Sequence, residues 1–203
     1  MSEFLSTGIP EIDSITDGLP RGAITELTGL ASSGKTSLLL HILSGATRSQ
    51  ELCALVDIND SFDVEAATQI GIDFDYLLWI RCCSNIDHGL KAAEFLLQSG
   101  GFGLVVLDLG DLSIDHPHNI PLSCWFRLRR AVENTRASLL IIEQEPRAKT
   151  CATLILETHG ECVKWLAPDQ PSTSAMFGGL KVHVERYKPI SSKNREIHFE
   201  TAF

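Results

Sequence analysis

A complete phosphate-binding motif of the form G-x-x-x-x-G-K-[ST] lies near the start of this sequence, and Ser37 follows it directly. Its residues are Gly29, Leu30, Ala31, Ser32, Ser33, Gly34, Lys35 and Thr36. The glycines allow a tight turn in which successive backbone N–H groups point at phosphate oxygens, and the following helix start adds a positive dipole end. Lys35 would neutralise the β and γ phosphates of ATP, and Thr36 would hold Mg²⁺. We therefore predict a nucleotide site over residues 29–37.

Two polar residues stand at the ends of apolar runs further along the chain. Asp108 ends the run 104–108, and Gln144 ends the run 139–144. A carboxylate at a strand end beside a phosphate loop serves Mg²⁺, and an amide there could sense the γ phosphate. We predict Lys35, Asp108 and Gln144 as the residues that act on the nucleotide, with Thr36 and Asp108 as the Mg²⁺ ligands. The alternatives are a chance glycine-rich turn, an ordinary polar strand end, or a site that binds nucleotide but hydrolyses it poorly.

The elements that must position these residues alternate between short apolar runs and longer amphipathic stretches, which is typical of βαβ units and a largely parallel sheet. The pattern predicts strands at 24–28, 53–58, 77–81, 104–109 and 139–143. It predicts helices at 35–47, 64–70, 86–98 and 122–135. The motif then lies between a strand and a helix, which is the context that it requires.

After Gln144 the pattern changes to consecutive strands at 153–158, 163–166, 181–187 and 196–200, which we interpret as an antiparallel extension. The stretches 111–121 and 169–179 carry the turn-forming residues of loops. No internal repeat or linker divides the chain. We expect a single α/β domain over residues 1–203.

Composition limits the classes of function. The chain has 203 residues, 44% of them hydrophobic, and a formal net charge of -9. Its longest apolar runs fall far short of the roughly 20 residues that cross a bilayer, and no secretion signal opens the sequence, so we expect a cytoplasmic protein without a membrane partner. The six cysteines lack the paired spacing of a zinc site and are expected to be free thiols, mostly in the core. The acidic balance weakens a DNA-binding hypothesis without refuting it, because a local basic patch could still act.

Several segments in order resemble the RecA family of recombinases and its shortened paralogues. They are Ser6-Thr7-Gly8-Ile9-Pro10-Glu11-Ile12-Asp13, Gly18-Leu19-Pro20-Arg21-Gly22, Ile24-Thr25-Glu26-Leu27, Ser32-Ser33-Gly34-Lys35-Thr36, Cys53-Ala54-Leu55-Val56-Asp57, Gly71-Ile72-Asp73 and the run 104–108. The resemblance implies a RecA-type P-loop NTPase core, a mostly parallel twisted sheet flanked by helices. It implies that Asp108 serves the metal and water, and that Gln144 couples the γ phosphate to DNA-binding loops.

The departures from the family pattern are also informative. The family's catalytic glutamate falls on Asn59, and an amide cannot take a proton from the attacking water, although the neighbouring Asp60 could substitute. The residue that stacks on adenine falls near Ala66. Only five residues precede Ser6, so we expect no polymerisation segment and no filament built by it. We likewise expect no counterpart of the C-terminal domain of bacterial RecA.

The resemblance implies that the loops after the fourth and fifth core strands face DNA, but the sequence gives no clear basic surface there. The stretch 111–121 has no Lys or Arg, and basic and acidic residues are mixed over 145–179. The group Arg127, Arg129 and Arg130 is either a DNA contact or a solvated helix face. Trp125 and Phe126 beside it are either a stacking platform for bases or core residues. The resemblance also suggests that Arg186 and Lys188 reach the nucleotide of a neighbouring subunit in a homo-oligomer.

Three functional hypotheses follow. The first is an ATP-binding RecA-like protein of DNA recombination or repair, with slow or DNA-dependent hydrolysis and single-stranded DNA as its partner. The second is a non-recombinase adaptor, similar to ImuA-type proteins, that supports an error-prone polymerase or a recombinase in the damage (SOS) response. The third is a KaiC-like or archaeal short-paralogue regulatory ATPase that assembles into rings or pairs. Under all three the cofactors are ATP and Mg²⁺, and whether the chain is an enzyme depends on the hydrolysis rate.

Overall fold

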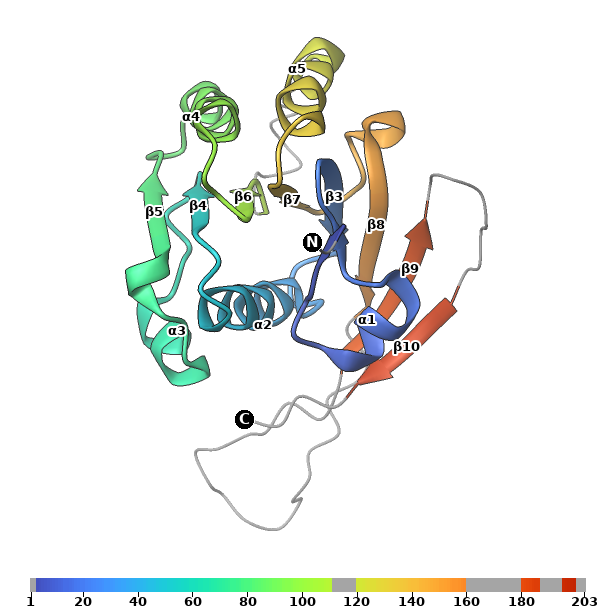
Figure 1. The fold of residues 1–203 in the computed structure, drawn as a ribbon. Helices are drawn as coiled ribbons and strands as arrows, with labels where there is room; N and C mark the ends of the chain where they lie inside the picture. The colour runs from blue at the N-terminus through green and yellow to red at the C-terminus, as the bar shows by residue number, and fades with distance from the viewer. Residues whose placement is uncertain (1–2, 111–119, 160–179, 187–194, 200–203) are drawn as a thin grey trace.

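The computed structural model describes residues 3–110, 120–159, 180–186 and 195–199, and eight strands of this part form one sheet (Figure 1). The strands are β3 (Ala23–Thr28), β4 (Cys53–Asp57), β5 (Leu77–Arg81), β6 (Leu104–Asp108), β7 (Ser138–Glu143), β8 (Ala152–His159), β9 (Leu180–Arg186) and β10 (Arg195–Phe199). Their order across the sheet is β10-β9-β8-β3-β7-β6-β4-β5. The six strands from β3 to β8 are parallel, whereas β9 and β10 are antiparallel additions at one edge.

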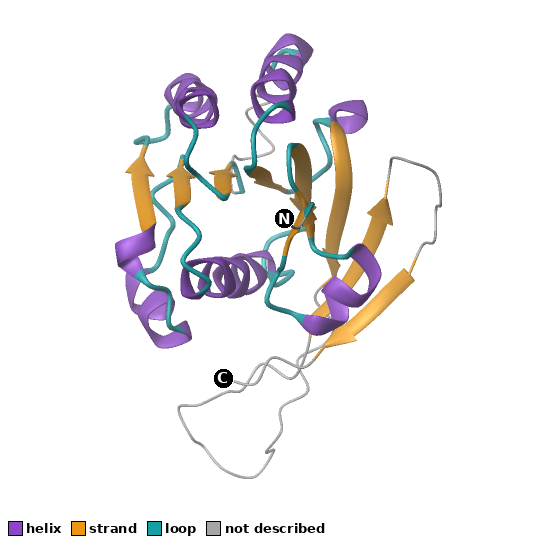
Figure 2. Cartoon of the chain, viewed as in Figure 1, coloured by secondary structure: helices purple, strands orange, loops and turns teal. Residues whose placement is uncertain are grey.

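Helices cover both faces of the sheet (Figures 1 and 2). On one face lie α2 (Lys35–Arg48), α3 (Val64–Ile70) and α1 (Pro10–Thr16), and on the other lie α4 (Ile86–Ser99) and α5 (Leu122–Glu133). The strands β1 (Phe4–Leu5) and β2 (Leu19–Pro20) form a separate two-stranded antiparallel sheet, which contacts β7 through the Ser138 hydroxyl. Two short 3₁₀ helices span Phe74–Tyr76 and Lys149–Cys151.

Two hydrophobic clusters, one on each face of the sheet, form the core. The first packs the α2 side chains, such as Leu38 and Ile42, against the sheet, and the second packs α4 and α5 through residues such as Leu97 and Trp125. Every residue of β4 and β7 is buried, which is why these strands read as continuous apolar runs rather than as alternating patterns. The α/β fold class with a parallel core is therefore confirmed.

Local sequence explains where several helices begin. The side chain of Asp63 caps α3 by accepting hydrogen bonds from the backbone N–H groups of Glu65 and Ala66, and Asn85 caps α4 by accepting from His88. Gly71 caps the C-terminal end of α3 with a φ of 82°, which a residue with a side chain adopts at an energetic cost. All four predicted helices and all five predicted core strands are present, with ends that differ by at most two residues.

The prediction for the strand after Gln144 needs a correction. The strand β8 was expected to begin the antiparallel extension, but it runs parallel to β3, and the antiparallel pairing starts only with β9. The reason is the route of the chain: residues 144–151 return from the end of β7 to the start of β3 on the α5 face, where Ala148 and Cys151 are buried in the second cluster. The predicted strand at 163–166 lies outside the described residues. The elements α1, β1 and β2 were not predicted.

No helix in the described part of the chain is both long and apolar enough to cross a membrane. Five cysteines fall among the described residues, and all five are free. Of these, Cys53, Cys82 and Cys151 are buried, as the sequence predicted for most of them.

Candidate nucleotide site

The phosphate loop lies between β3 and α2, and its backbone adopts conformations that favour glycine. Gly29 has a φ of 151° and Gly34, at the start of α2, has a φ of 91°. A Cβ at Gly29 would lie 2.6 Å from the carbonyl oxygen of Thr158 on β8. Ser32 also has a positive φ, 61°, which costs energy for a residue with a side chain and is often found at ligand sites.

Hydrogen bonds to neighbouring strands hold the loop in place. The Gly29 N–H donates to the carbonyl oxygen of Gln144 at 3.2 Å, and the Ser33 and Thr158 hydroxyls share a hydrogen bond of 2.7 Å. By contrast, Leu30 and Thr36 are exposed. A cavity of about 390 Å³ is lined by the eight residues from Leu30 to Ser37, a volume within the usual range of ligand pockets. The loop is therefore anchored at its base and open at its tip.

The Lys35 ammonium is buried beside the loop and held by main-chain oxygens. Only 7% of Lys35 is exposed, and its Nζ donates to the carbonyl oxygen of Gly29 and, at 3.3 Å, to that of Glu143. Buried cations need such partners because an unpaired charge loses its hydration without compensation. The charge therefore stays next to the N–H groups of the loop, which is the arrangement that favours a bound anion.

The predicted metal and sensor residues converge on the same edge of the sheet. Asp108 ends β6 and is half-buried, and its Oδ1 accepts a hydrogen bond of 2.8 Å from the Gly110 N–H. Asp108 pairs in register with Ile142 on β7 and with Asp57 on β4. Gln144 follows β7, and its carbonyl contacts the loop. The carboxyl edge of a parallel sheet is where open α/β folds bind ligands.

The available oxygen atoms suit Mg²⁺ better than a transition metal. Among the described residues no three His, Cys, Asp or Glu side chains form a metal-binding group. Mg²⁺ does not need such a group, because it usually keeps several waters and is bound through one or two carboxylates and the phosphates of the substrate. The Thr36 hydroxyl and the Asp108 carboxylate fit that mode of binding.

The segment after β4 is held by a buried carboxylate that the sequence analysis did not single out. Asp57 is fully buried, and its two oxygens accept hydrogen bonds from the N–H groups of Ser61 and Phe62 and from the Trp79 indole, at 3.0–3.2 Å. These three donors fix the short loop 58–62, which carries Asn59. The signal in the sequence was an acid inside an apolar strand, which is costly unless hydrogen-bonded.

Asp60, the predicted substitute for the missing glutamate, is engaged by an arginine. Its Oδ2 lies 3.1 Å from the Arg81 guanidinium, and Arg81 also stacks over the Trp79 ring at 5.3 Å. Asp60 has a positive φ of 57°. The Asp60 carboxylate is therefore already engaged, and a water molecule would have to compete with Arg81 for its Oδ2 atom.

The residues considered for DNA contact divide between core and surface. Trp125 is 2% exposed and belongs to the core, whereas Phe126 is 50% exposed. Two of the arginines on α5 are already paired: Arg127 with Glu94 of α4, and Arg129 with Glu133 at 2.8 Å. The loop residues 111–119 and 160–179, Lys188 and the side chain of Arg186 lie outside the described part.

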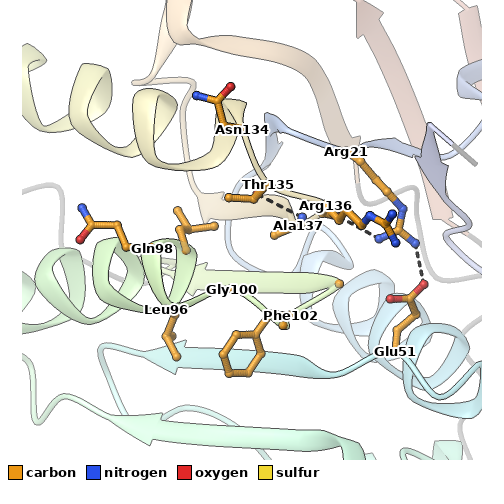
Figure 3. A pocket seen from close by; sticks show the side chains of 13 residues that line it. Arg21, Glu51, Leu96, Gln98, Gly100, Phe102, Asn134, Thr135, Arg136 and Ala137 are labelled. Atoms are coloured by element: carbon orange, nitrogen blue, oxygen red, sulfur yellow. Dashed lines mark hydrogen bonds and ion pairs between the residues drawn. The ribbon is translucent and has the colours of Figure 1, made fainter. Parts of the chain in front are cut away.

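A second cavity, of about 840 Å³, lies at the amino ends of the strands, whereas the phosphate loop lies at their carboxyl ends (Figure 3). Its lining comes from the last turn of α4, from the segments that follow α4 and α5, and from Arg21 and Glu51. Arg21 pairs with Glu51 at 2.6 Å and donates to the Arg136 carbonyl oxygen. This second cavity is larger than the cavity at the phosphate loop, but it lies at the amino ends of the strands, away from Lys35, Asp108 and Gln144. We therefore place the candidate site at the phosphate loop.

Comparison with known proteins agrees with this geometry. The family model of the RecA N-terminal domain matches residues 2–113, more than half of the chain. The chain belongs to the RecA family. Protein RecA of Leifsonia xyli is 30% identical over 141 residues, which cover 63% of this chain and 39% of that protein. Protein RecA of Clavibacter michiganensis is 41% identical over 91 residues, 45% of this chain and 25% of that protein.

The RecA-type fold is also that of a solved structure. The crystal structure of the RadB recombinase matches with a TM-score of 0.71 at 18% identity, covering 97% of this chain and 96% of that one. At this identity the similarity shows the fold alone. The matched part of the chain spans well under half the length of the bacterial RecA relatives. What those proteins do is therefore a starting point for a proposal.

Proposed function

We propose that this RecA-family chain binds ATP with Mg²⁺ and acts in DNA recombination or repair, hydrolysing ATP slowly. The observation that supports the proposal best is the complete phosphate loop between β3 and α2, with the Lys35 ammonium buried beside it. A chance glycine-rich turn would not need a buried lysine whose ammonium binds the main-chain oxygens of Gly29 and Glu143.

The residues of the site have separate tasks under this proposal. The N–H groups of the loop bind phosphate oxygens, and Lys35 turns its ammonium from the Gly29 and Glu143 carbonyls to the β and γ phosphates. Thr36 and Asp108 hold Mg²⁺, which neutralises phosphate charge when bound. Gln144 responds to the presence of the γ phosphate, because its backbone carbonyl already contacts the loop at Gly29.

Slow hydrolysis is inferred from the groups around the expected position of the general base. Asn59 has no carboxylate to accept a proton, and Asp60 is paired with Arg81. Water activation would have to use a carboxylate that is already engaged. Nucleotide binding does not depend on either residue, so tight binding with slow turnover is the expected behaviour.

ATP binding and turnover by the purified chain, with and without single-stranded DNA, test the proposal. Lys35→Ala should weaken ATP binding at least tenfold, a loss of about 1.4 kcal/mol or more, and Lys91→Ala on the exposed face of α4 is the matched control. Chelation of Mg²⁺ should weaken binding in the same direction. Equal ATP affinity of the wild type and Lys35→Ala would refute the site. Turnover at the rate of an active recombinase would refute slow hydrolysis.

The adaptor hypothesis is kept as a second proposal because of the arginines on α5. Since Arg127 and Arg129 each face a glutamate, part of their positive charge toward DNA phosphates is offset. In an adaptor ATP would stabilise a binding surface rather than drive a cycle. ATP binding without DNA-stimulated turnover, together with co-purification of a polymerase or recombinase subunit, would favour it. The solution mass with and without ATP tests for a homo-oligomer.

A further inference from the structure

The chain crosses over between β7 and β8 without a long helix, and a buried glutamate in the middle of β3 holds this crossover. The crossover comprises residues 144–151. The Oε1 atom of Glu26 accepts hydrogen bonds from the N–H groups of Arg147, at 2.7 Å, and Ala148, at 2.6 Å. Buried N–H groups need acceptors, and an irregular crossover cannot supply them from its own ladder. Glu26 therefore fixes the crossover against the strand that leads into the phosphate loop.

A second buried carboxyl group lies beside the first. Glu143, the last residue of β7, is 3% exposed, and Glu26 is fully buried. Three carboxyl oxygens of the pair, Glu26 Oε2 and both oxygens of Glu143, accept no hydrogen bond from the described residues. Acceptors that are buried together without a donor are costly, and one proton on either carboxyl group supplies a donor between them.

The charges around the pair also call for one proton. Three charged or titratable groups face Glu143: Glu26 from β3, Arg147 from the crossover and Lys35 from α2. The Arg147 Nε atom lies 3.8 Å from Glu143 Oε2, and Lys35 donates to the Glu143 carbonyl oxygen. At the same ends of the strands, Asp57 ends β4 and Asp108 ends β6, and the partly exposed Glu157 lies near the end of β8. Arg147 places one guanidinium at Glu143, and this single positive charge balances one carboxylate of the pair. One proton balances the second carboxyl group.

We propose that Glu26 and Glu143 share one proton, and that this buried pair positions the crossover, and with it Gln144, against the phosphate loop. The proton is held at neutral pH and released at alkaline pH, which leaves two buried negative charges facing one guanidinium. Repulsion between the carboxylates then loosens the two N–H bonds that Glu26 accepts. Glu26 and Glu143 are positioning residues, because they act on the site through the crossover and through the Glu143 carbonyl that Lys35 contacts.

The titration of Glu143 agrees with this geometry. Burial, and after it the adjacent Glu26, raises the pKa of Glu143 to about 9, while Arg147 acts in the opposite direction. The protonated form therefore prevails at neutral pH. The link to Gln144 and ATP rests on the proposed function, whereas the proton and its effect on the crossover do not.

Amide hydrogen exchange of the protein without nucleotide tests the first step. The result is expressed as protection factors, which remove the intrinsic pH dependence of exchange. The protection factors of the Arg147 and Ala148 amides should fall by up to tenfold per pH unit as the pH approaches 9 and the proton is lost. In Glu143→Gln, whose amide donates at every pH, it should stay constant. Glu133→Gln, which alters an exposed glutamate on α5, should behave as the wild type. Identical pH profiles for the wild type and Glu143→Gln would overturn the proposal.

ATP affinity measured over the same pH range tests the second step. The wild type should lose affinity at alkaline pH by a larger factor than Glu143→Gln. Lys35→Ala should bind ATP poorly at every pH but keep the pH-dependent protection of the crossover. If the wild type binds no ATP but shows that protection profile, the proposed function fails and the shared proton stands. If ATP binds with the same pH dependence in the wild type and Glu143→Gln, the coupling to the nucleotide site is refuted.

Discussion

The raised pKa of Glu143 makes a quantitative prediction about stability against pH. In the unfolded chain this carboxyl group has an ordinary pKa of 4.5, and in the folded protein the value is about 9. Between these values the folded state holds a proton that the unfolded chain has released. The free energy of unfolding contributed by Glu143 is therefore fully present below about pH 4.5 and is lost as the pH rises toward 9.

The size of the effect follows from the linkage of proton binding to folding. Each pH unit between these two pKa values changes the free energy of unfolding by ~1.4 kcal/mol. The protein should therefore lose at most about 2.7 kcal/mol of stability between roughly pH 6.5 and 8.5. Because Glu143 is only 3% exposed, solvent screening reduces this free-energy change very little. Such a change is a large part of the ~5–15 kcal/mol that stabilises an ordinary domain.

Glu143→Gln isolates this contribution, because the amide keeps the shape of the side chain but carries no charge at any pH. Urea denaturation at several pH values should show the variant gaining stability over the wild type by ~1 kcal/mol or more for each pH unit above neutrality. Glu133→Gln should differ from the wild type by the same amount at every pH. If the difference between wild type and Glu143→Gln does not change with pH, Glu143 is not protonated in the folded state and the reasoning is wrong.

Three other substitutions test the site. Gly29→Ala should abolish ATP binding and lower stability by about 2 kcal/mol, because its Cβ would lie 2.6 Å from the Thr158 carbonyl oxygen; calorimetric titration and thermal melting measure the two effects. Asp57→Ala should cost about 3 kcal/mol in urea denaturation, since three donors lose their acceptor. Arg81→Ala should change stability by less than ~0.5 kcal/mol, because the Arg81 side chain is largely exposed. The same variant should raise the rate of ATP hydrolysis, because it frees Asp60, and an unchanged rate would show that Asp60 does not activate water.

The order of the elements was predictable because parallel strands buried on both faces leave continuous apolar runs. The loop between β3 and α2 was predictable because its motif lies within eight consecutive residues. The direction of β8 was not, because a strand carries no local signal of the route by which the chain returns to it. That route depends on residues 144–151, which are too short to form a crossover helix and pack on the α5 face instead.

The buried acids were missed for a related reason. Glu26 lies in an apolar run, and its sequence context indicates only the family resemblance. Its hydrogen-bond partners, Arg147 and Ala148, are more than a hundred residues away. Asp60 and Arg81 are 21 residues apart and meet only because β4 and β5 are neighbours. Pairings of this kind depend on sheet order, which the pattern of a single sequence does not specify.

The groups proposed to bind phosphate are neighbours in the sequence, whereas those that would activate water lie in another loop. This difference bears on the role of the nucleotide in this chain. The groups that we propose to bind phosphate are contiguous and anchored at their base by the β7 and β8 strand ends. The groups that would activate water come from a separate loop, where Asn59 cannot act as a base and Asp60 is held by an arginine. Under the proposed function, binding would therefore be preserved where hydrolysis is impeded. A bound γ phosphate would then persist long enough for Gln144 and the crossover behind it to act as a signal of nucleotide occupancy, rather than as one step of a rapid cycle.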